Sequence, residues 1–113
     1  MTKPPREVFA DIDELAARHR SHGVSLILDW IEAQAALDLW VHVLDPPPNH
    51  DGRGGRAVTD ALSLADRYHL RVTLVASADS DGPLDNAGLI AWYMSFGFVQ
   101  DPPGGTWMTR EAR

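Results

Sequence analysis

The sequence predicts a single α+β domain with a mixed sheet and flanking helices. Its 113 residues suffice for one hydrophobic core. Helical and strand patterns then alternate along the chain. The distance along the chain between the strands before and after the central helix suits a right-handed parallel crossover. The other strands are close enough in sequence to form hairpins. We therefore expect one domain over residues 1–113, with a mostly antiparallel sheet that contains one parallel strand pair.

The composition is that of an ordinary folded chain. Hydrophobic residues make up 44% and charged residues 23% of the sequence, which argues against a disordered tail or a fibre. Ten basic against 16 acidic side chains give a net charge of −6, which argues against direct binding of nucleic acid or anionic membrane. The absence of cysteine excludes disulfides, thiolate metal sites and a cysteine nucleophile.

The N-terminal residues give no sign of a targeting segment. Residues 1–6 lack the apolar region of a signal peptide, and no apolar run approaches the ~20 residues that span a bilayer. We therefore expect a soluble cytoplasmic protein without a membrane partner.

The first third of the chain predicts a helix and two strands. Residues 7–22 place apolar side chains at helical spacing, with acids early and bases late, and Gly23 suits the end of that helix. The mostly apolar runs 24–31 and 37–44 follow, and we expect them to pair as an antiparallel hairpin. The Ala-rich stretch 32–36 between them would also suit a helix.

The middle of the chain predicts a strand, a glycine-rich loop, a helix and a strand. Three prolines at 46–48 end the second strand. Residues 49–56 form a loop rich in Gly and Arg, and residues 57–69 carry an apolar helical face. The β-branched residues of 70–77 then predict the parallel strand.

The last third predicts a loop, a helix and a closing hairpin. Polar residues 78–85 separate the parallel strand from a helix at 86–96, which ends at Gly97. Residues 98–100 and 106–109 flank a Pro- and Gly-rich turn, as in a hairpin.

The histidines do not predict a metal site. The five of them show no paired spacing beyond His19 and His22, and the helical pattern puts this pair on a solvent-exposed face.

The glycine-rich loop suggests a phosphate site. Glycines allow backbone N–H groups to approach an anion, and a helix that follows adds unpaired donors and its positive dipole end. Arg53 and Arg56 add local positive charge. A turn that caps the helix, with both arginines in solvent, would explain the same residues. A Walker loop is excluded because no lysine is present there, and the dinucleotide pattern is matched only formally.

Two motifs in this chain resemble those of the GNAT N-acetyltransferases. The family's pyrophosphate loop, Val-x-Pro-x-x-Arg/Gln-x-x-Gly-x-Gly/Ala, corresponds to residues 44–54, although Asn49 replaces the usual Arg or Gln. A second signature of the family follows at the spacing that the family shows, in Asn86, Tyr93, Gly97 and Phe98.

The resemblance covers residues 37–111 and implies a minimal GNAT-like fold with a splayed parallel strand pair. Residues 1–36 supply less than the family's usual N-terminal part. The chain is therefore similar to the minimal GNATs among phage-borne proteins, which include an anti-CRISPR acetyltransferase, and the resemblance suggests that a second subunit completes a homodimer.

The resemblance also implies the parts of an acyl transfer from acetyl-CoA. Tyr93 would be the catalytic residue that protonates the departing CoA thiolate, although Trp92 and Tyr93 would also suit a simple aromatic packing pair. The implied cofactor-binding residues, through backbone amides or side chains, are His42, Val43, Leu44, His50, Asp51, Gly52, Arg53, Gly54, Gly55 and Asn86.

The sequence does not identify the general base or the acceptor substrate. Candidate bases are His42, Asp45, Glu32, Asp79 and Asp81. We expect an N-acetyltransferase that acts on a primary amine of a protein lysine or a small molecule. A catalytically inactive GNAT-like protein that binds a protein partner is the alternative.

Overall fold

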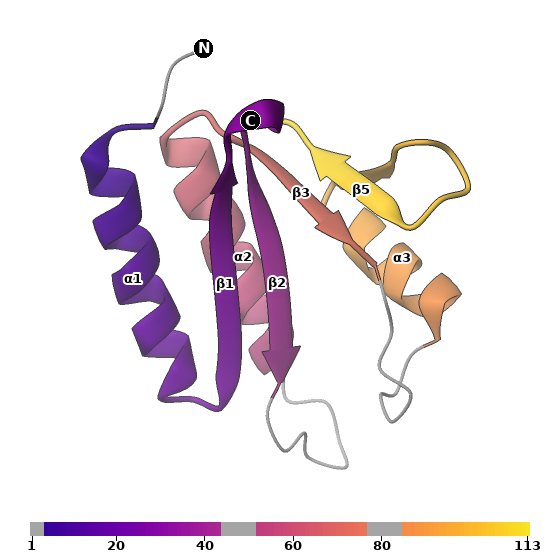
Figure 1. Cartoon of the computed structure of the whole chain (residues 1–113). Coiled ribbons are helices and arrows are strands. Elements are labelled where there is room, and N and C mark those ends of the chain that lie inside the picture. Colours follow the sequence, from indigo (N-terminus) through magenta and orange to yellow (C-terminus); the bar gives the residue numbers. More distant parts are fainter. Residues whose placement is uncertain (1–3, 44–51, 77–84) are drawn as a thin grey trace.

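The computed structural model describes residues 4–43, 52–76 and 85–113. They form a five-stranded sheet with helices packed against it (Figure 1). The strand order is β1-β2-β3-β5-β4, so the last strand of the chain lies between the third and the fourth. The elements are α1 (Arg6–Arg20), β1 (Val24–Ile31), the short 3₁₀ helix η1 (Glu32–Gln34), β2 (Ala36–Val43), α2 (Arg53–Arg67), β3 (Arg71–Val75), α3 (Asn86–Met94), β4 (Val99–Gln100) and β5 (Trp107–Arg110).

The first two strands form a hairpin in which every residue is paired. Their antiparallel register runs from Val24 opposite Val43 to Ile31 opposite Ala36. The turn between them contains η1 and closes at Ala35, whose φ of 49° lies in the left-handed region. The Ala-rich connection is thus a single helical turn inside a hairpin, and both expectations for it were partly right.

Alternation along the strands separates the sheet into a covered face and an open face. Leu26, Leu28, Leu37 and Leu39 point to the covered face and are buried, as strand periodicity requires. In Figure 1, α2 lies behind the hairpin and α1 lies beside β1, and side chains of both helices share a core with these leucines. Among the described residues, the largest fully buried side chains are those of Phe98, Leu37, Leu74, Met108, Val8, Val24, Val58 and Val72.

The parallel pair joins only the first residues of its two strands. β2 pairs with β3 from Ala36 opposite Arg71 to Asp38 opposite Thr73, and the remaining residues of the two strands have no mutual register. Figure 1 shows the strands running apart from this shared start, toward the end of the sheet where the chain enters α2. The right-handed twist of strands favours such divergence when few bonds hold a pair together. The splayed parallel pair is thereby confirmed.

The C-terminal segment, residues 85–110, begins with a helix cap and ends with an antiparallel hairpin. The Asp85 carboxylate accepts the Gly88 amide at 2.7 Å and caps the start of α3. Gly97 ends the segment after α3 with a φ of 98°, which favours glycine. β5 then pairs with both β3 and β4. The expected closing hairpin is confirmed.

A buried arginine holds three of these elements together. Arg110 lies at the end of β5 and is 6% exposed. It forms a bidentate ion pair with Asp66 in the last turn of α2, with N–O distances of 2.9 and 3.0 Å. Its Nε also donates to the Phe96 carbonyl after α3, at 3.1 Å. The Arg110 guanidinium lowers the pKa of the Asp66 carboxyl, and the nearby Arg113 backbone amide adds to this effect.

The structure confirms the α+β class, the flanking helices and the mostly antiparallel mixed sheet. Most boundaries differ from the expected ones by one or two residues, and the largest difference is at the start of α2. The helix expected from Ala57 begins at Arg53, so the second half of the glycine-rich loop is helical. Among the described residues, none of the helices combines the length and apolar character that crossing a membrane requires.

We expect Asp66→Ala to lower the free energy of unfolding by about 3 kcal/mol, because it leaves a buried guanidinium without its carboxylate. Chemical denaturation with circular dichroism would measure it. Asp13→Ala, which removes an exposed carboxylate of α1, is the matched control. Because the folded-state pKa of Asp66 is lowered, its contribution is fully present above the unfolded value of about 4 and is lost as the pH falls through the folded value. An equal loss in both variants would contradict this role.

Candidate functional site

The first turn of α2 carries the glycines and arginines of the sequence motif. Gly52 precedes the helix with a φ of 80° and accepts the Arg56 amide at 2.9 Å, which closes the turn. Within the helix the amides of Gly54 and Gly55 have no carbonyl to bond, because they lie in its first turn. This end of α2 therefore offers backbone donors together with the positive end of the helix dipole.

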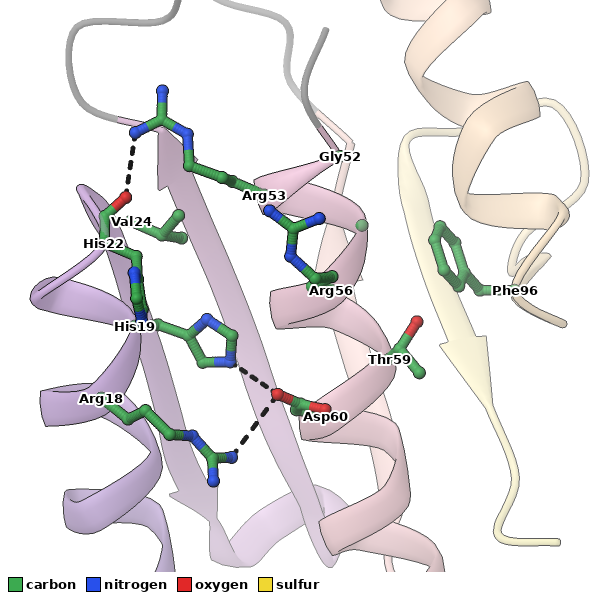
Figure 2. Close-up of a pocket in the computed structure, with 11 residues that line it drawn as sticks. Arg18, His19, His22, Val24, Gly52, Arg53, Arg56, Thr59, Asp60 and Phe96 are labelled. Atoms are coloured by element: carbon green, nitrogen blue, oxygen red, sulfur yellow. Dashed lines mark hydrogen bonds and ion pairs between the residues drawn. The ribbon is translucent and has the colours of Figure 1, made fainter.

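An open groove of about 750 Å³ lies over this end of α2 (Figure 2). The end of α1 and the turn after it contribute Arg18, His19 and His22. The first two turns of α2 contribute their two arginines, Thr59 and Asp60, and Phe96 reaches the groove from beyond α3. Figure 2 shows the α1 and α2 side chains facing one another across the groove.

The groove has more positive than negative charge. Three arginines line it against one carboxylate, that of Asp60. His19 Nε2 lies 2.8 Å from Asp60 Oδ2, and Arg18 Nη2 lies 3.5 Å from the same oxygen. Arg53 Nη1 donates to the His22 carbonyl at 2.9 Å and so holds its side chain across the groove. In a chain of net charge −6, this concentration of donors and positive charge suits an anion.

Several of the predicted cofactor-binding residues meet at this place. Gly52, Arg53 and Gly55 line the groove, and Gly54 lies in the same helical turn. His42 and Val43 lie at the end of β2. Asn86 is the first residue of α3 and does not line the groove. The predicted residues Leu44, His50 and Asp51 lie outside the described residues.

The α1 wall of the groove was not predicted, and the expectation for His19 was wrong. His19 is 7% exposed because α2 packs against this side of α1 and Asp60 pairs with its ring. The signal was present in the sequence. Val8, Ile12 and Leu15 form the buried stripe of α1, and His19 continues it one turn later. Within the described part of the chain, no group of three or more His, Cys, Asp or Glu side chains is arranged to hold a metal ion.

Tyr93 lies on the same side of the sheet as the groove. It is 8% exposed and belongs to the core that α2 also forms. Its ring packs edge-on against Trp92 and Phe98, at 5.0 and 5.7 Å between centroids, and Trp92 packs in the same way on Phe96 of the groove. Burial raises the pKa of the Tyr93 hydroxyl, so it stays protonated at neutral pH.

The candidate general bases lie at different distances from the groove. Glu32 lies in η1, at the other end of the hairpin from the start of α2 (Figure 1), so it is too distant to serve chemistry there. His42 lies near the end of β2 on the open face, where its ring stacks on Trp40 at 5.7 Å. Asp45, Asp79 and Asp81 lie outside the described residues.

This chain matches no protein-family model, no curated protein and no solved structure. The two sequence motifs and the geometry of the groove are therefore the basis for assigning a function.

We expect Arg53→Gln/Arg56→Gln to weaken binding of inorganic pyrophosphate by about tenfold or more, because each charge-assisted hydrogen bond contributes about 1.5–3 kcal/mol. Isothermal titration at low and moderate salt would measure it, and the difference should shrink as salt rises. Arg6→Gln, at the far end of α1 from the groove, is the matched control. Equal affinity in all three proteins would show that the groove is not an anion site.

Proposed function

We propose that this chain is an acetyl-CoA-dependent N-acetyltransferase of the GNAT type. The observation that carries the proposal is the position of the arginine-lined groove. It lies at the helix start that follows β2, at the end of the sheet where β2 and β3 run apart. Backbone donors, the helix dipole and arginines together suit the diphosphate of CoA.

The splayed strands favour a place for the rest of the cofactor. From Leu39 to Val43, β2 keeps its register with β1 but has none with β3. An extended pantetheine chain is lined with amides and suits the edge of a strand that has no neighbour in register. The backbone at His42 and Val43 would then orient the thioester, and one N–H would polarise its carbonyl oxygen.

Tyr93 is the proposed proton donor. Its place on the groove side of the sheet, two turns after Asn86, supports this role. Because burial makes this phenol a weaker acid than usual, a positioned hydrogen bond to the sulfur contributes more than full proton transfer.

The reaction is a direct transfer. The lone pair of a neutral amine attacks the thioester carbon, the new C–N bond forms and the C–S bond breaks. The thiolate accepts a hydrogen bond from Tyr93 Oη and takes its proton, Tyr93 is reprotonated from water, and the amine proton leaves to water or to a base. The acceptor is a primary amine of a protein lysine or of a small molecule, and a cytoplasmic location and a homodimer stay predictions.

A second candidate is a GNAT-like protein that binds its ligand without turnover. The burial of Tyr93 within an aromatic cluster favours it, because a phenol held by Trp92 and Phe98 also has an ordinary packing role.

Binding and turnover separate the two candidates. We expect acetyl-CoA to raise the melting temperature more than ATP does, because ATP lacks the pantetheine arm that would lie along β2. Thiol release with a panel of amines, and a mass gain of one acetyl group on the acceptor, would then show transfer. Stabilisation without thiol release favours the binding protein, and no stabilisation by acetyl-CoA contradicts both.

Tyr93→Phe tests the catalytic role. We expect the rate of thiol release to fall by about a hundredfold, because the proton donor is lost, while acetyl-CoA binding stays nearly unchanged. Steady-state kinetics and titration of acetyl-CoA would measure the two effects. Tyr68→Phe is the control, since that hydroxyl bonds Asp11 on α1. Unchanged turnover in Tyr93→Phe would remove the residue from the mechanism.

A further inference from the structure

The face of the sheet opposite the groove has no described helix over it. Residues of β1 and β2 that alternate with the buried leucines point to this side. The residues paired with them on β3, β5 and β4 lie on the same face of the sheet. The helices pack on the other side. In Figure 1, α2 lies behind the hairpin, and α1 and α2 share a core with the buried leucines. A side chain at Gly55 of α2 would contact Trp92 and Phe96 at 3.9 Å, which places α3 beside α2.

This open face is unusually apolar. Of the seven large hydrophobic side chains exposed in the described residues, five belong to it: Ile27, Trp40, Val75, Val99 and Trp107. Trp40 is 50% exposed and Trp107 47%. Exposed apolar clusters on this scale mark interaction surfaces, and tryptophan is prominent among residues that dominate binding energy.

Two carboxylates lie among these apolar side chains. Asp29 on β1 and Asp38 on β2 are opposite one another in register, so they occupy neighbouring positions on the same face. Like charges in this arrangement repel. The Thr73 hydroxyl donates to Asp38 Oδ1 at 3.2 Å, which satisfies one oxygen but brings no positive charge. Burial and the Asp29 charge raise the pKa of the Asp38 carboxyl.

One cationic side chain beside this pair, that of Arg71, already has a carboxylate partner. Arg71 reaches the same face at the start of β3, but its Nε lies 2.7 Å from the Glu111 carboxylate. His42 lies four residues after Asp38 on β2, and its ring stacks on Trp40. The two aspartates thus offer negative charge, next to the exposed apolar side chains of Ile27 and Trp40, to a cation from outside.

We propose that the open face of the sheet is a docking surface for a protein partner that presents a lysine or arginine among apolar side chains. The cation lies between Asp29 and Asp38, and the apolar residues around it cover Trp40, Ile27, Val75 and Trp107. The partner's charge relieves the repulsion between the aspartates, and the surrounding contact excludes water from the ion pair.

Size and charge favour this occupant over two others. Four strand spacings of about 4.8 Å extend the face over about 19 Å, the scale of a protein interface and more than a small amine would cover. A second copy, docked face to face about a two-fold axis, would bring four aspartates together. The inference does not depend on the proposed function, because this face lies opposite the groove.

Selection from a displayed library of random linear peptides tests the proposal. We expect the peptides that bind the wild-type protein to combine a lysine or arginine with aromatic or aliphatic residues. Their dissociation constants, measured by fluorescence anisotropy, should rise by about tenfold or more for Asp29→Asn/Asp38→Asn and for Trp40→Ser. The controls are Asp13→Asn/Glu14→Gln and Phe9→Ser, which remove two exposed carboxylates and an exposed aromatic ring from α1.

Thermal melts and pyrophosphate titration separate loss of docking from loss of fold. The Asp29→Asn/Asp38→Asn protein should melt no lower than wild type, since it removes a like-charge contact, and should bind pyrophosphate normally. Peptides that bind this variant as tightly as wild type would overturn the proposal. So would a library without any binder sensitive to Trp40→Ser, or a wild-type dimer in sedimentation analysis that Trp40→Ser converts to monomer.

Discussion

The arrangement of the second half of the chain depends on the buried ion pair between Arg110 and Asp66. It joins β5 to the last turn of α2, and the bond from Arg110 Nε to the Phe96 carbonyl ties in the segment after α3. A buried guanidinium that satisfies a carboxylate and a carbonyl at once allows few alternative packings. Phe96 and, three residues earlier, Tyr93 are therefore held against α2. The candidate chemistry at the start of α2 is thus positioned by a contact at its far end.

The short parallel pair explains why ligand groups gather at one end of the sheet. Three residues of β2 and β3 pair near the start of both strands, and twist then carries the strands apart. α2 begins at the same end of the sheet (Figure 1). The start of α2, whose first amides need hydrogen-bond partners, consequently lies near the ends of β2 and β3 that do not pair with each other. Both features offer backbone hydrogen-bonding groups to an extended, anionic ligand.

Much of this fold could be predicted because the local patterns agree with the tertiary structure. β1 occupies Val24–Ile31, as its apolar run predicts, and the strand, helix and parallel strand follow in the expected order. The start of α2 was misplaced because Gly54 and Gly55 disfavour a helix, whereas packing of Ala57 and Val58 in the core extends the helix back to Arg53. The groove's α1 wall was missed for a different reason. The buried stripe of α1 indicates that His19 is buried, but its pairing with Asp60 joins residues 41 apart, and no local pattern encodes that contact.

The two faces of the sheet differ in charge, and this difference constrains how ligands approach. The helix side concentrates arginines at one groove, while the open side has two aspartates within apolar surface. Since the whole chain has a net charge of −6, its long-range field repels anions, and attraction to the groove acts only within about one Debye length of 8–10 Å. An anionic ligand therefore gains most of its affinity from close contacts with the amides and arginines of α2. A cationic partner, in contrast, is attracted from a distance by the same net charge, so the open face favours fast encounter with a basic protein while the groove favours selective binding of a phosphate.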